Sequence, residues 1–183
     1  MIVYDGKTGE RLLTVTDEHQ NSQFGQALAA VGDIDGDNTP DFAIAAQSKS
    51  GGSVAIISGR TGNSLYELQG EGPGDRFGAV LHKLPDWRGD HRPVLAVTSL
   101  RGGPTGGGYV RVFDLAHGAP LQTFAMTGGR LGYGMINLGD RTGDGLLDLG
   151  VMSIALDGAT TLWVMSYADI TNGNGPWPGN TPR

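Results

Sequence analysis

The sequence predicts an all-β protein built from β-propeller blades, and three observations support this prediction. Glycine supplies 32 of the 183 residues, more than twice the usual share of about 7%. The apolar segments are short, rich in β-branched and aromatic residues, and bounded by turn residues, as is typical of strands. The same pattern also recurs along the chain at a nearly fixed period. Four short strands per repeat, joined by hairpins, describe one blade of a propeller.

The repeat is marked by a large apolar residue followed by glycine. Subtraction of residue numbers places these pairs 53 and 54 positions apart, at Phe24-Gly25, Phe77-Gly78 and Leu131-Gly132. Each pair is expected to open a first strand, which leads into an acidic loop. These loops begin at Asp33, Asp86 and Asp140. Large residues at this position are expected to wedge between blades, and the glycines suit a place where the innermost strands crowd together.

Short apolar runs after each acidic loop supply the remaining strands. The second strands are expected at residues 42–46, 94–98 and 149–154. The third strands follow a Gly-rich turn and are expected at residues 54–57, 109–113 and 161–165. Fourth strands are expected in the first two repeats only, at residues 64–68 and 121–124.

The N-terminal segment repeats part of the same unit, because residues 3–9 parallel residues 56–62. We therefore expect five segments: outer strands of a shared blade in 1–16, repeats in 17–70, 71–124 and 125–168, and a flexible tail in 169–183. This amounts to about three and a half blades, whereas a propeller commonly has about four to eight. Either the chain is a piece of a longer propeller, or two copies form a homodimer that closes a six- or seven-bladed ring.

Charge and composition exclude several classes of partner and chemistry. The chain has 13 basic and 19 acidic residues, for a net charge of -6, so no cationic surface for nucleic acid is expected. The absence of cysteine excludes disulfides and thiol chemistry. No apolar run reaches the roughly 18 residues of a membrane span. The first residues lack the charged and apolar regions of a signal peptide.

The first acidic loop, residues 33–41, has the pattern of a calcium site. Its carboxylates and one backbone carbonyl could surround a single hard cation, with ligands from Asp33, Asp35, Asp37, Thr39 and Asp41. Calcium is the natural candidate because it takes six to eight oxygen ligands at roughly 2.3 to 2.6 Å. Gly36 allows the sharp bend that lets the ligands converge. A solvated acidic turn without metal is the alternative.

The same loop does not fit the helix-flanked EF-hand. That motif requires glycine at its sixth position and glutamate at its twelfth, where this chain has Asn38 and Ile44. The flanking segments also have the pattern of strands rather than helices. The calcium loop is therefore expected on a β-hairpin.

The order of motifs resembles the FG-GAP repeat of integrin α-subunit propellers and of many bacterial surface proteins. The resemblance covers residues 1 to about 168 and is most specific in the first repeat, with Phe-Gly followed by Asp-x-Asp-Gly-Asp-x-x-x-Asp. It implies a propeller whose blades bind Ca²⁺ in the loop between their first two strands. It also implies an extracellular or cell-surface location and work in adhesion or protein recognition. The implied ligands are Asp33, Asp35, Asp37, the Thr39 carbonyl and Asp41.

The second and third loops vary these ligands. In the second loop Arg88 replaces Asp35 and Val94 replaces Asp41, so Arg88 is expected to bridge Asp86 and Asp90 in place of an ion. The tripeptide Arg88-Gly89-Asp90 is also an integrin recognition sequence, but its Gly and Asp follow from the repeat. The third loop is expected to form a second, weaker site with Asp140, Thr142, Asp144, the Leu146 carbonyl and Asp148.

No motif for catalysis is recognisable, so a non-catalytic protein-interaction or adhesion scaffold is expected. The four histidines lack zinc-site spacing, and neither a nucleophile elbow nor a Walker-type loop occurs. Two alternatives stay open: a carbohydrate-binding propeller or accessory module of a secreted hydrolase, and a self-assembling structural propeller. Trp87 and Trp163 could stack on sugars, although packing is favoured. The remaining acidic residues are expected to be solvated: Glu18, Glu67, Glu71 and Asp75.

Overall fold

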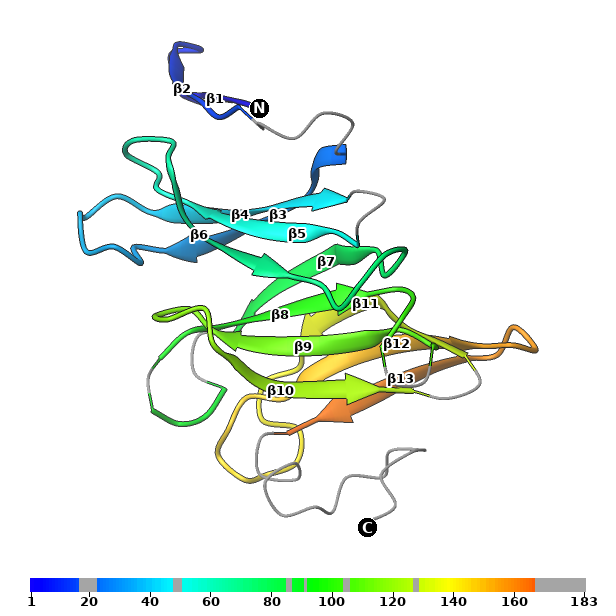
Figure 1. The fold of residues 1–183 in the computed structure, drawn as a ribbon. Helices are drawn as coiled ribbons and strands as arrows, with labels where there is room; N and C mark the ends of the chain where they lie inside the picture. The colour runs from blue at the N-terminus through cyan, green and yellow to red at the C-terminus, as the bar shows by residue number, and fades with distance from the viewer. Residues whose placement is uncertain are drawn as a thin grey trace.

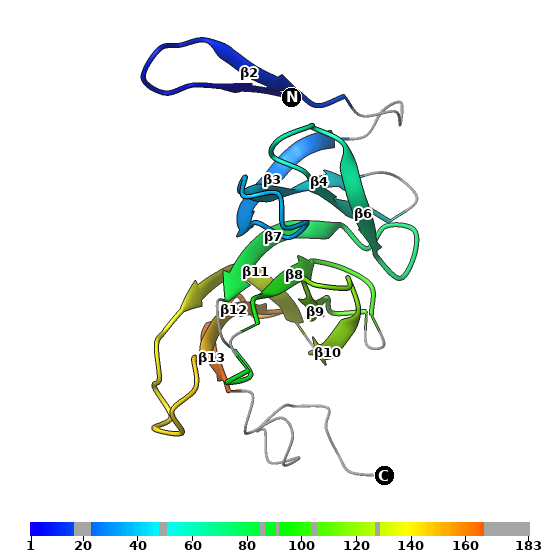
Figure 2. The same cartoon turned by 90° about the vertical axis from the view of Figure 1, so that its left-hand side faces the viewer.

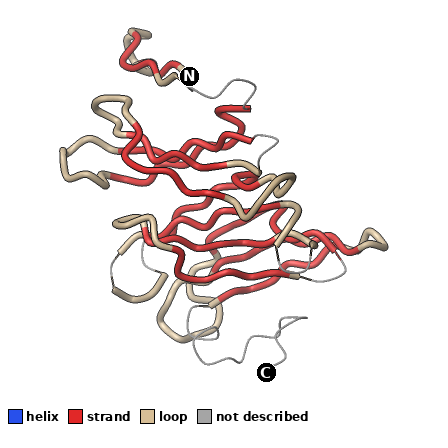
Figure 3. The backbone as a smooth tube through the Cα atoms, in the orientation of Figure 1, coloured by secondary structure: helices blue, strands red, loops and turns tan. Residues whose placement is uncertain are grey.

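The computed structural model of the chain describes residues 1–16, 23–47, 51–84, 87–90, 92–103, 106–126 and 129–166. Within these ranges thirteen strands form four antiparallel sheets and no helix occurs (Figure 3). The all-β architecture predicted from the sequence is confirmed. No helix among the described residues has the length and apolar character that a membrane crossing needs. The expected tail, residues 169–183, and Glu18 lie outside the described residues.

Each sheet is a meander whose strands follow chain order. The N-terminal hairpin has β1 (Ile2–Tyr4) and β2 (Arg11–Thr14). The first sheet has β3 (Gln23–Gly32), β4 (Asp41–Gln47), β5 (Ser53–Ile57) and β6 (Ser64–Gln69). The second sheet has β7 (Phe77–Leu84), β8 (Val94–Ser99), β9 (Tyr109–Asp114) and β10 (Pro120–Ala125). The third sheet has β11 (Gly129–Asn137), β12 (Leu149–Ala155) and β13 (Thr160–Met165).

The sheets stack face to face in chain order, with the hairpin at one end and the β11–β13 sheet at the other (Figures 1 and 2). The first strands of successive sheets are neighbours, because β7 contacts both β3 and β11. This arrangement is consistent with propeller blades, whose innermost strands gather near a common axis.

Apolar cores lie between successive units rather than within one sheet. Between the first and second sheets the core includes Val54, Ile56 and Phe77, and between the second and third it includes Val112 and Leu149. A smaller cluster with Val15, Ile44 and Ile57 joins the hairpin to the first sheet.

The second sheet shows why its strands have nearly continuous apolar sequences. On β9, Tyr109 and Phe113 pack toward the first sheet, while Val110 and Val112 pack toward the third. Because both faces are covered, the usual alternation of apolar and polar residues is lost. Phe77 lies in the same layer, with its ring centroid 6.0 Å from that of Phe113.

The repeated glycine after each large apolar residue forms a bulge in the first strand. The register of the first and second strands shifts just after it in all three sheets. The backbone φ is positive at each of these positions, 90° at Gly25, 85° at Gly78 and 93° at Gly132. Glycine adopts this conformation without steric cost, which explains its place in the repeat.

Two of these glycines also allow close contact between sheets. A Cβ atom built on Gly78 would lie 2.8 Å from the Ala45 Cβ, and one on Gly132 would lie 2.7 Å from the Thr98 Cβ. Ala45 and Thr98 are equivalent residues of the preceding second strands. No described atom lies within 4 Å of such a Cβ at Gly25, because the hairpin before it supplies no second strand.

Candidate metal site in the acidic loop

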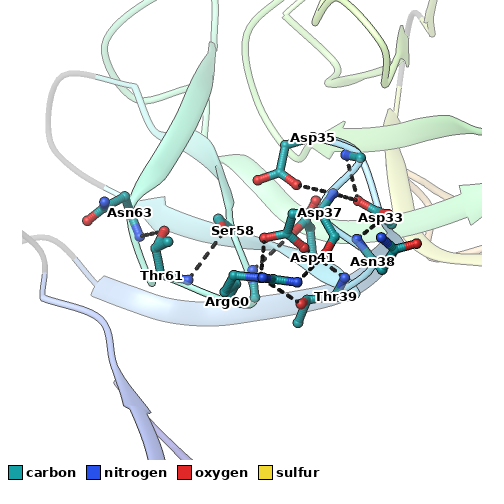
Figure 4. Close-up of polar contacts among 12 residues, drawn as sticks. Asp33, Asp35, Asp37, Asn38, Thr39, Asp41, Ser58, Arg60, Thr61 and Asn63 are labelled. Atoms are coloured by element: carbon teal, nitrogen blue, oxygen red, sulfur yellow. Dashed lines mark hydrogen bonds and ion pairs between the residues drawn. The ribbon is translucent and has the colours of Figure 1, made fainter.

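The first acidic loop joins β3 to β4 at one end of the first sheet. Strand pairing places Gly32 opposite Asp41, so residues 33–40 project beyond the ladder. The turn between β5 and β6 lies beside this loop and contributes Ser58, Gly59 and Arg60 to its surroundings (Figure 4).

Three aspartates of this loop converge. Asp33, Asp35 and Asp37 each offer one carboxylate oxygen, and these oxygens all lie within 4.8 Å of one another. In the described ranges of the chain, no other group of three or more His, Cys, Asp and Glu side chains converges in this way. Because every donor is an oxygen, the set fits a hard cation such as Ca²⁺.

Backbone amides fix the shape of the loop around Asp33. The Asp33 carboxylate accepts hydrogen bonds from the amides of Gly36 (2.7 Å), Asp37 (3.1 Å) and Asn38 (2.8 Å). The Asp37 amide also donates to Asp35 at 3.1 Å. Asn38 has a φ of 65°, a left-handed conformation that Asn tolerates better than most residues. The side chains thus form the turns that hold their own carboxylates together.

Asp41 has a different position from the other three aspartates. Its side chain is buried, with a residue exposure of 1%, and it lies outside the converging group. One carboxylate oxygen accepts a hydrogen bond from the Ile34 amide at 2.7 Å, and the other accepts one from the Gly59 amide at 2.9 Å. Asp41 therefore closes the base of the loop and ties it to the β5–β6 turn, and its role as a ligand stays a prediction.

Thr39 lies between the loop and the neighbouring turn. Its amide donates to Asp37 at 2.7 Å, and its hydroxyl accepts a hydrogen bond from Arg60 at 3.3 Å. Its carbonyl remains a predicted ligand.

The third loop repeats the same hydrogen-bond pattern. Asp140 accepts hydrogen bonds from the amides three, four and five residues ahead, as Asp33 does. Asp148 is buried and accepts one from the Arg141 amide at 2.7 Å, matching Asp41 and Ile34. The Thr142 hydroxyl, a predicted ligand, donates to Asp148 at 3.3 Å.

Two further predicted ligands of the third loop contact each other. The Leu146 amide donates to Asp144 at 2.8 Å. Two hydrogen bonds lower the pKa of the Asp144 carboxyl: the one from the Ser166 hydroxyl has the larger effect and the one from the Leu146 amide the smaller. The structure therefore places Asp140, Thr142, Asp144, Leu146 and Asp148 in one loop without the convergence seen in the first, and the weaker site stays a prediction.

In the second loop an arginine pairs with aspartates. Arg88 Nη2 lies 2.7 Å from Asp90 Oδ2 and 3.6 Å from Asp114 Oδ2. The predicted pairing with Asp90 is present, and Asp86 lies outside the described residues. Asp114 was missed by the sequence reasoning. It is the last residue of β9 and holds the position of Ser58 in the first repeat, and this replacement of a hydroxyl by a carboxylate was the available signal.

Asp75 contradicts the expectation that the remaining acidic residues are solvated. It has a residue exposure of 4% and accepts hydrogen bonds from the amides of Glu71 (2.7 Å) and Gly72 (3.1 Å) and from the Tyr109 hydroxyl (3.0 Å). Burial, together with the nearby Asp75 charge, raises the pKa of Tyr109 to about 12. Glu71 forms an ion pair with Arg111, so it is not simply solvated either. The polar network orders the link between the first and second sheets.

Both tryptophans in the described part of the chain, Trp87 and Trp163, pack within the protein. Trp87 is fully buried and contacts Phe124 edge to face, with ring centroids 6.2 Å apart. Trp163 packs against the core between the second and third sheets and donates to the Ser153 hydroxyl at 2.8 Å. The idea of a sugar-stacking surface on Trp87 is therefore wrong, because the ring is inaccessible.

Comparison with known families identifies the first repeat. Residues 24–57 match the FG-GAP repeat, a range that begins at Phe24, contains the acidic loop and ends with β5. No curated protein matched the chain. The matched range contains the converging aspartates, and the second and third sheets repeat its strand order, its bulge and parts of its loop pattern. Residues 24–57, which make up most of the first full sheet, therefore carry an FG-GAP repeat.

Proposed function

We propose that this chain is a calcium-stabilised propeller-type module that acts as a scaffold for protein interaction or adhesion and carries out no catalysis. The observation that carries the proposal is the convergence of Asp33, Asp35 and Asp37 oxygens within 4.8 Å in the β3–β4 loop of an FG-GAP repeat. Three like charges so close together are costly without a cation. A divalent ion would remove this repulsion and hold the loop closed.

The effect of calcium on stability can be stated in advance. A ligand that binds only the folded state stabilises it by RT ln(1 + [L]/Kd), or about 2.7 kcal/mol at a hundredfold excess over Kd. Extracellular modules commonly bind calcium with Kd of about 10⁻⁴ to 10⁻³ M. An extracellular setting would therefore suit even a weak site in this loop.

The scaffold role is supported by the architecture. Stacked sheets with shared cores hold their connecting loops at fixed positions, and loops on a rigid frame commonly carry recognition. The family resemblance points to protein partners. The burial of Trp87 removes one of the two tryptophans on which the carbohydrate alternative depended.

Thermal unfolding in calcium and in chelator tests the proposal. The wild type is expected to melt at a higher temperature in millimolar Ca²⁺ than in chelator. Asp35→Asn should lose most of this difference while melting normally in chelator, because it removes one charge of the repelling group. Asp157→Asn is the matched control, since Asp157 is an exposed carboxylate in the β12–β13 turn. Equal melting temperatures of the wild type with and without calcium would refute the calcium role.

Self-association is a second candidate function, favoured by exposed apolar side chains on the outermost sheets. Leu12 on the hairpin is 62% exposed, and Leu162 on β13 is 56% exposed. A cavity of about 320 Å³ also opens between the hairpin and the first sheet, lined by Val15, Phe24 and Ala55 among others. Sedimentation of the wild type should show a dimer that Leu162→Lys weakens. A monomer at all concentrations would exclude this function.

A further inference from the structure

The central aspartate of each acidic loop uses one carboxylate oxygen for a backbone contact and the other for a side-chain contact in all three sheets. These residues are Asp37, Asp90 and Asp144. In each case Oδ1 accepts a hydrogen bond from the amide two residues ahead, at 2.7, 3.1 and 2.8 Å respectively. The other oxygen, Oδ2, receives a different partner in each sheet. The repeat therefore keeps the backbone contact and changes the partner of Oδ2.

The three partners differ in charge and in accessibility. Asp90 pairs with Arg88 of its own loop, whose side chain is 14% exposed. Asp144 accepts a hydrogen bond from the neutral hydroxyl of Ser166. Asp37 pairs with Arg60, whose side chain is 58% exposed. Only the Arg60 partner combines a full positive charge with ready access to solvent.

Arg60 reaches the calcium loop from the neighbouring β5–β6 turn. Its Nε lies 3.0 Å from Asp37 Oδ2 and 3.3 Å from the Thr39 hydroxyl oxygen. Its Nη2 donates to the Asp37 carbonyl. Figure 4 shows the guanidinium beside Asp37 and Thr39, with Asp33 and Asp35 on the far side of Asp37. A single side chain thus engages a loop carboxylate that calcium would also need.

We propose that Arg60 is a tethered counter-ion of the first acidic loop and thereby sets its affinity for calcium. The inference rests on the proposed calcium function and adds its regulation. Without metal, the guanidinium offsets part of the repulsion among the three carboxylates. With metal, the same positive charge opposes the ion, and the contact with Asp37 must be given up or weakened. Arg60 therefore stabilises the metal-free loop and lowers the affinity of the metal site.

The size of this effect follows from the exposure of the pair. Ion pairs at exposed positions shift an equilibrium by up to about fivefold. Replacing Arg60 by glutamine should thus lower the Kd for calcium about two- to fivefold and lower the melting temperature in chelator. The effect should shrink at high salt because exposed charges are screened.

Calcium titration by calorimetry tests the proposal, with all proteins carrying Asp144→Asn so that the third loop does not contribute. The parent is compared with Arg60→Gln and with Lys7→Gln. Lys7 is the matched control, because it is exposed and holds the position equivalent to Arg60 in the N-terminal hairpin. Lys7→Gln should leave both the Kd and the melting temperature in chelator unchanged.

Each outcome decides between the possibilities. Tighter binding by Arg60→Gln, with unchanged binding by Lys7→Gln, supports the inference. If the parent binds calcium and Arg60→Gln binds equally or more weakly, the counter-ion role is overturned while the calcium function stands. Equal tightening by both variants would show a general charge effect and overturn it as well. If no variant binds millimolar calcium, the inference fails together with the proposed function.

Discussion

Arg88 and Asp114 form an ion pair that joins the second acidic loop to the end of the third strand of the same sheet. Their closest charged atoms, Nη2 and Oδ2, lie 3.6 Å apart. The Arg88 side chain is 14% exposed and the Asp114 side chain 9% exposed. This arrangement supplies a fixed positive charge at the place where the first loop has converging carboxylates.

Replacing Arg88 should therefore destabilise the protein without any dependence on calcium. Arg88→Met leaves the Asp114 carboxylate buried without its cation, and loss of one partner of a buried pair is costly. Partial exposure reduces the penalty, so we expect a loss of about 1 to 3 kcal/mol in the free energy of unfolding. Urea unfolding with and without chelator measures it. Arg92→Met, at an exposed position of the same loop, should change stability by less than about 0.5 kcal/mol. Equal losses for both variants would contradict the assignment.

The close contact between sheets gives a second prediction. Gly78→Ala should cost about 2 to 5 kcal/mol, because it adds a clash with Ala45 to the strain of a positive φ. Gly25→Ala carries the same φ strain without the clash and should cost only about 1 to 2 kcal/mol. The difference between the two unfolding free energies isolates the contact between sheets. A Gly25→Ala variant as unstable as Gly78→Ala would exclude that contact as the cause.

Removing the buried carboxylate of Asp75 should be more damaging than removing an exposed one. Asp75→Ala leaves the Glu71 and Gly72 amides and the Tyr109 hydroxyl without their acceptor. Unsatisfied buried polar groups cost about 1 to 3 kcal/mol each, and partial rehydration should limit the total loss to about 2 to 4 kcal/mol. Chemical denaturation is the measurement. Glu67→Ala, at an exposed site on β6, should be close to neutral, and a neutral Asp75→Ala would show that the network is dispensable.

Histidine protonation should weaken the fold in mild acid. Burial lowers the pKa of His82 below its usual value of about 6.5, and its Nε2 has no hydrogen-bond partner among the described residues. The unfolded chain therefore binds a proton at His82 more readily than the folded chain does. The resulting contribution to stability is fully present above about pH 6.5 and is lost as the pH falls below that value. The melting temperature of the wild type should decrease between pH 7 and pH 5.5. His82→Gln should flatten this slope, and an unchanged slope would assign the proton uptake elsewhere.

Much of the fold could be predicted because short sequence patterns mark the strands and turns of each repeat. Each predicted strand overlaps an observed one, since Gly-rich turns and β-branched runs fix strand positions before any packing occurs. The wedging residue and the glycine after it, predicted to lie where the innermost strands crowd together, were recognisable for the same reason, whereas the bulge at this glycine was not predicted. Phe77 and Leu131 are fully buried between sheets, as their recurrence predicted.

Long-range partners were harder to predict from the sequence. Asp33, Asp35 and Asp37 lie in one loop, so their convergence follows from spacing alone. Arg60 is far from that loop in sequence and reaches it only because β5 pairs with β4. The burial of Asp75 likewise depends on Tyr109, which is brought to it by the packing of the first two sheets. Spacing therefore predicted the acidic cluster and could not predict its counter-ion.

The sharing of each apolar layer by just two successive sheets has a consequence for evolution. A duplicated segment of one repeat would form a sheet with one half of an apolar interface on each face. Each of these halves would already match the opposite face of the neighbouring copy. Tandem duplication could therefore lengthen such a protein without redesign of its interior. Afterwards the copies could diverge at their exposed loops. The acidic loops illustrate such divergence, because three equivalent aspartates have different partners: Arg60 for Asp37, Arg88 for Asp90 and Ser166 for Asp144.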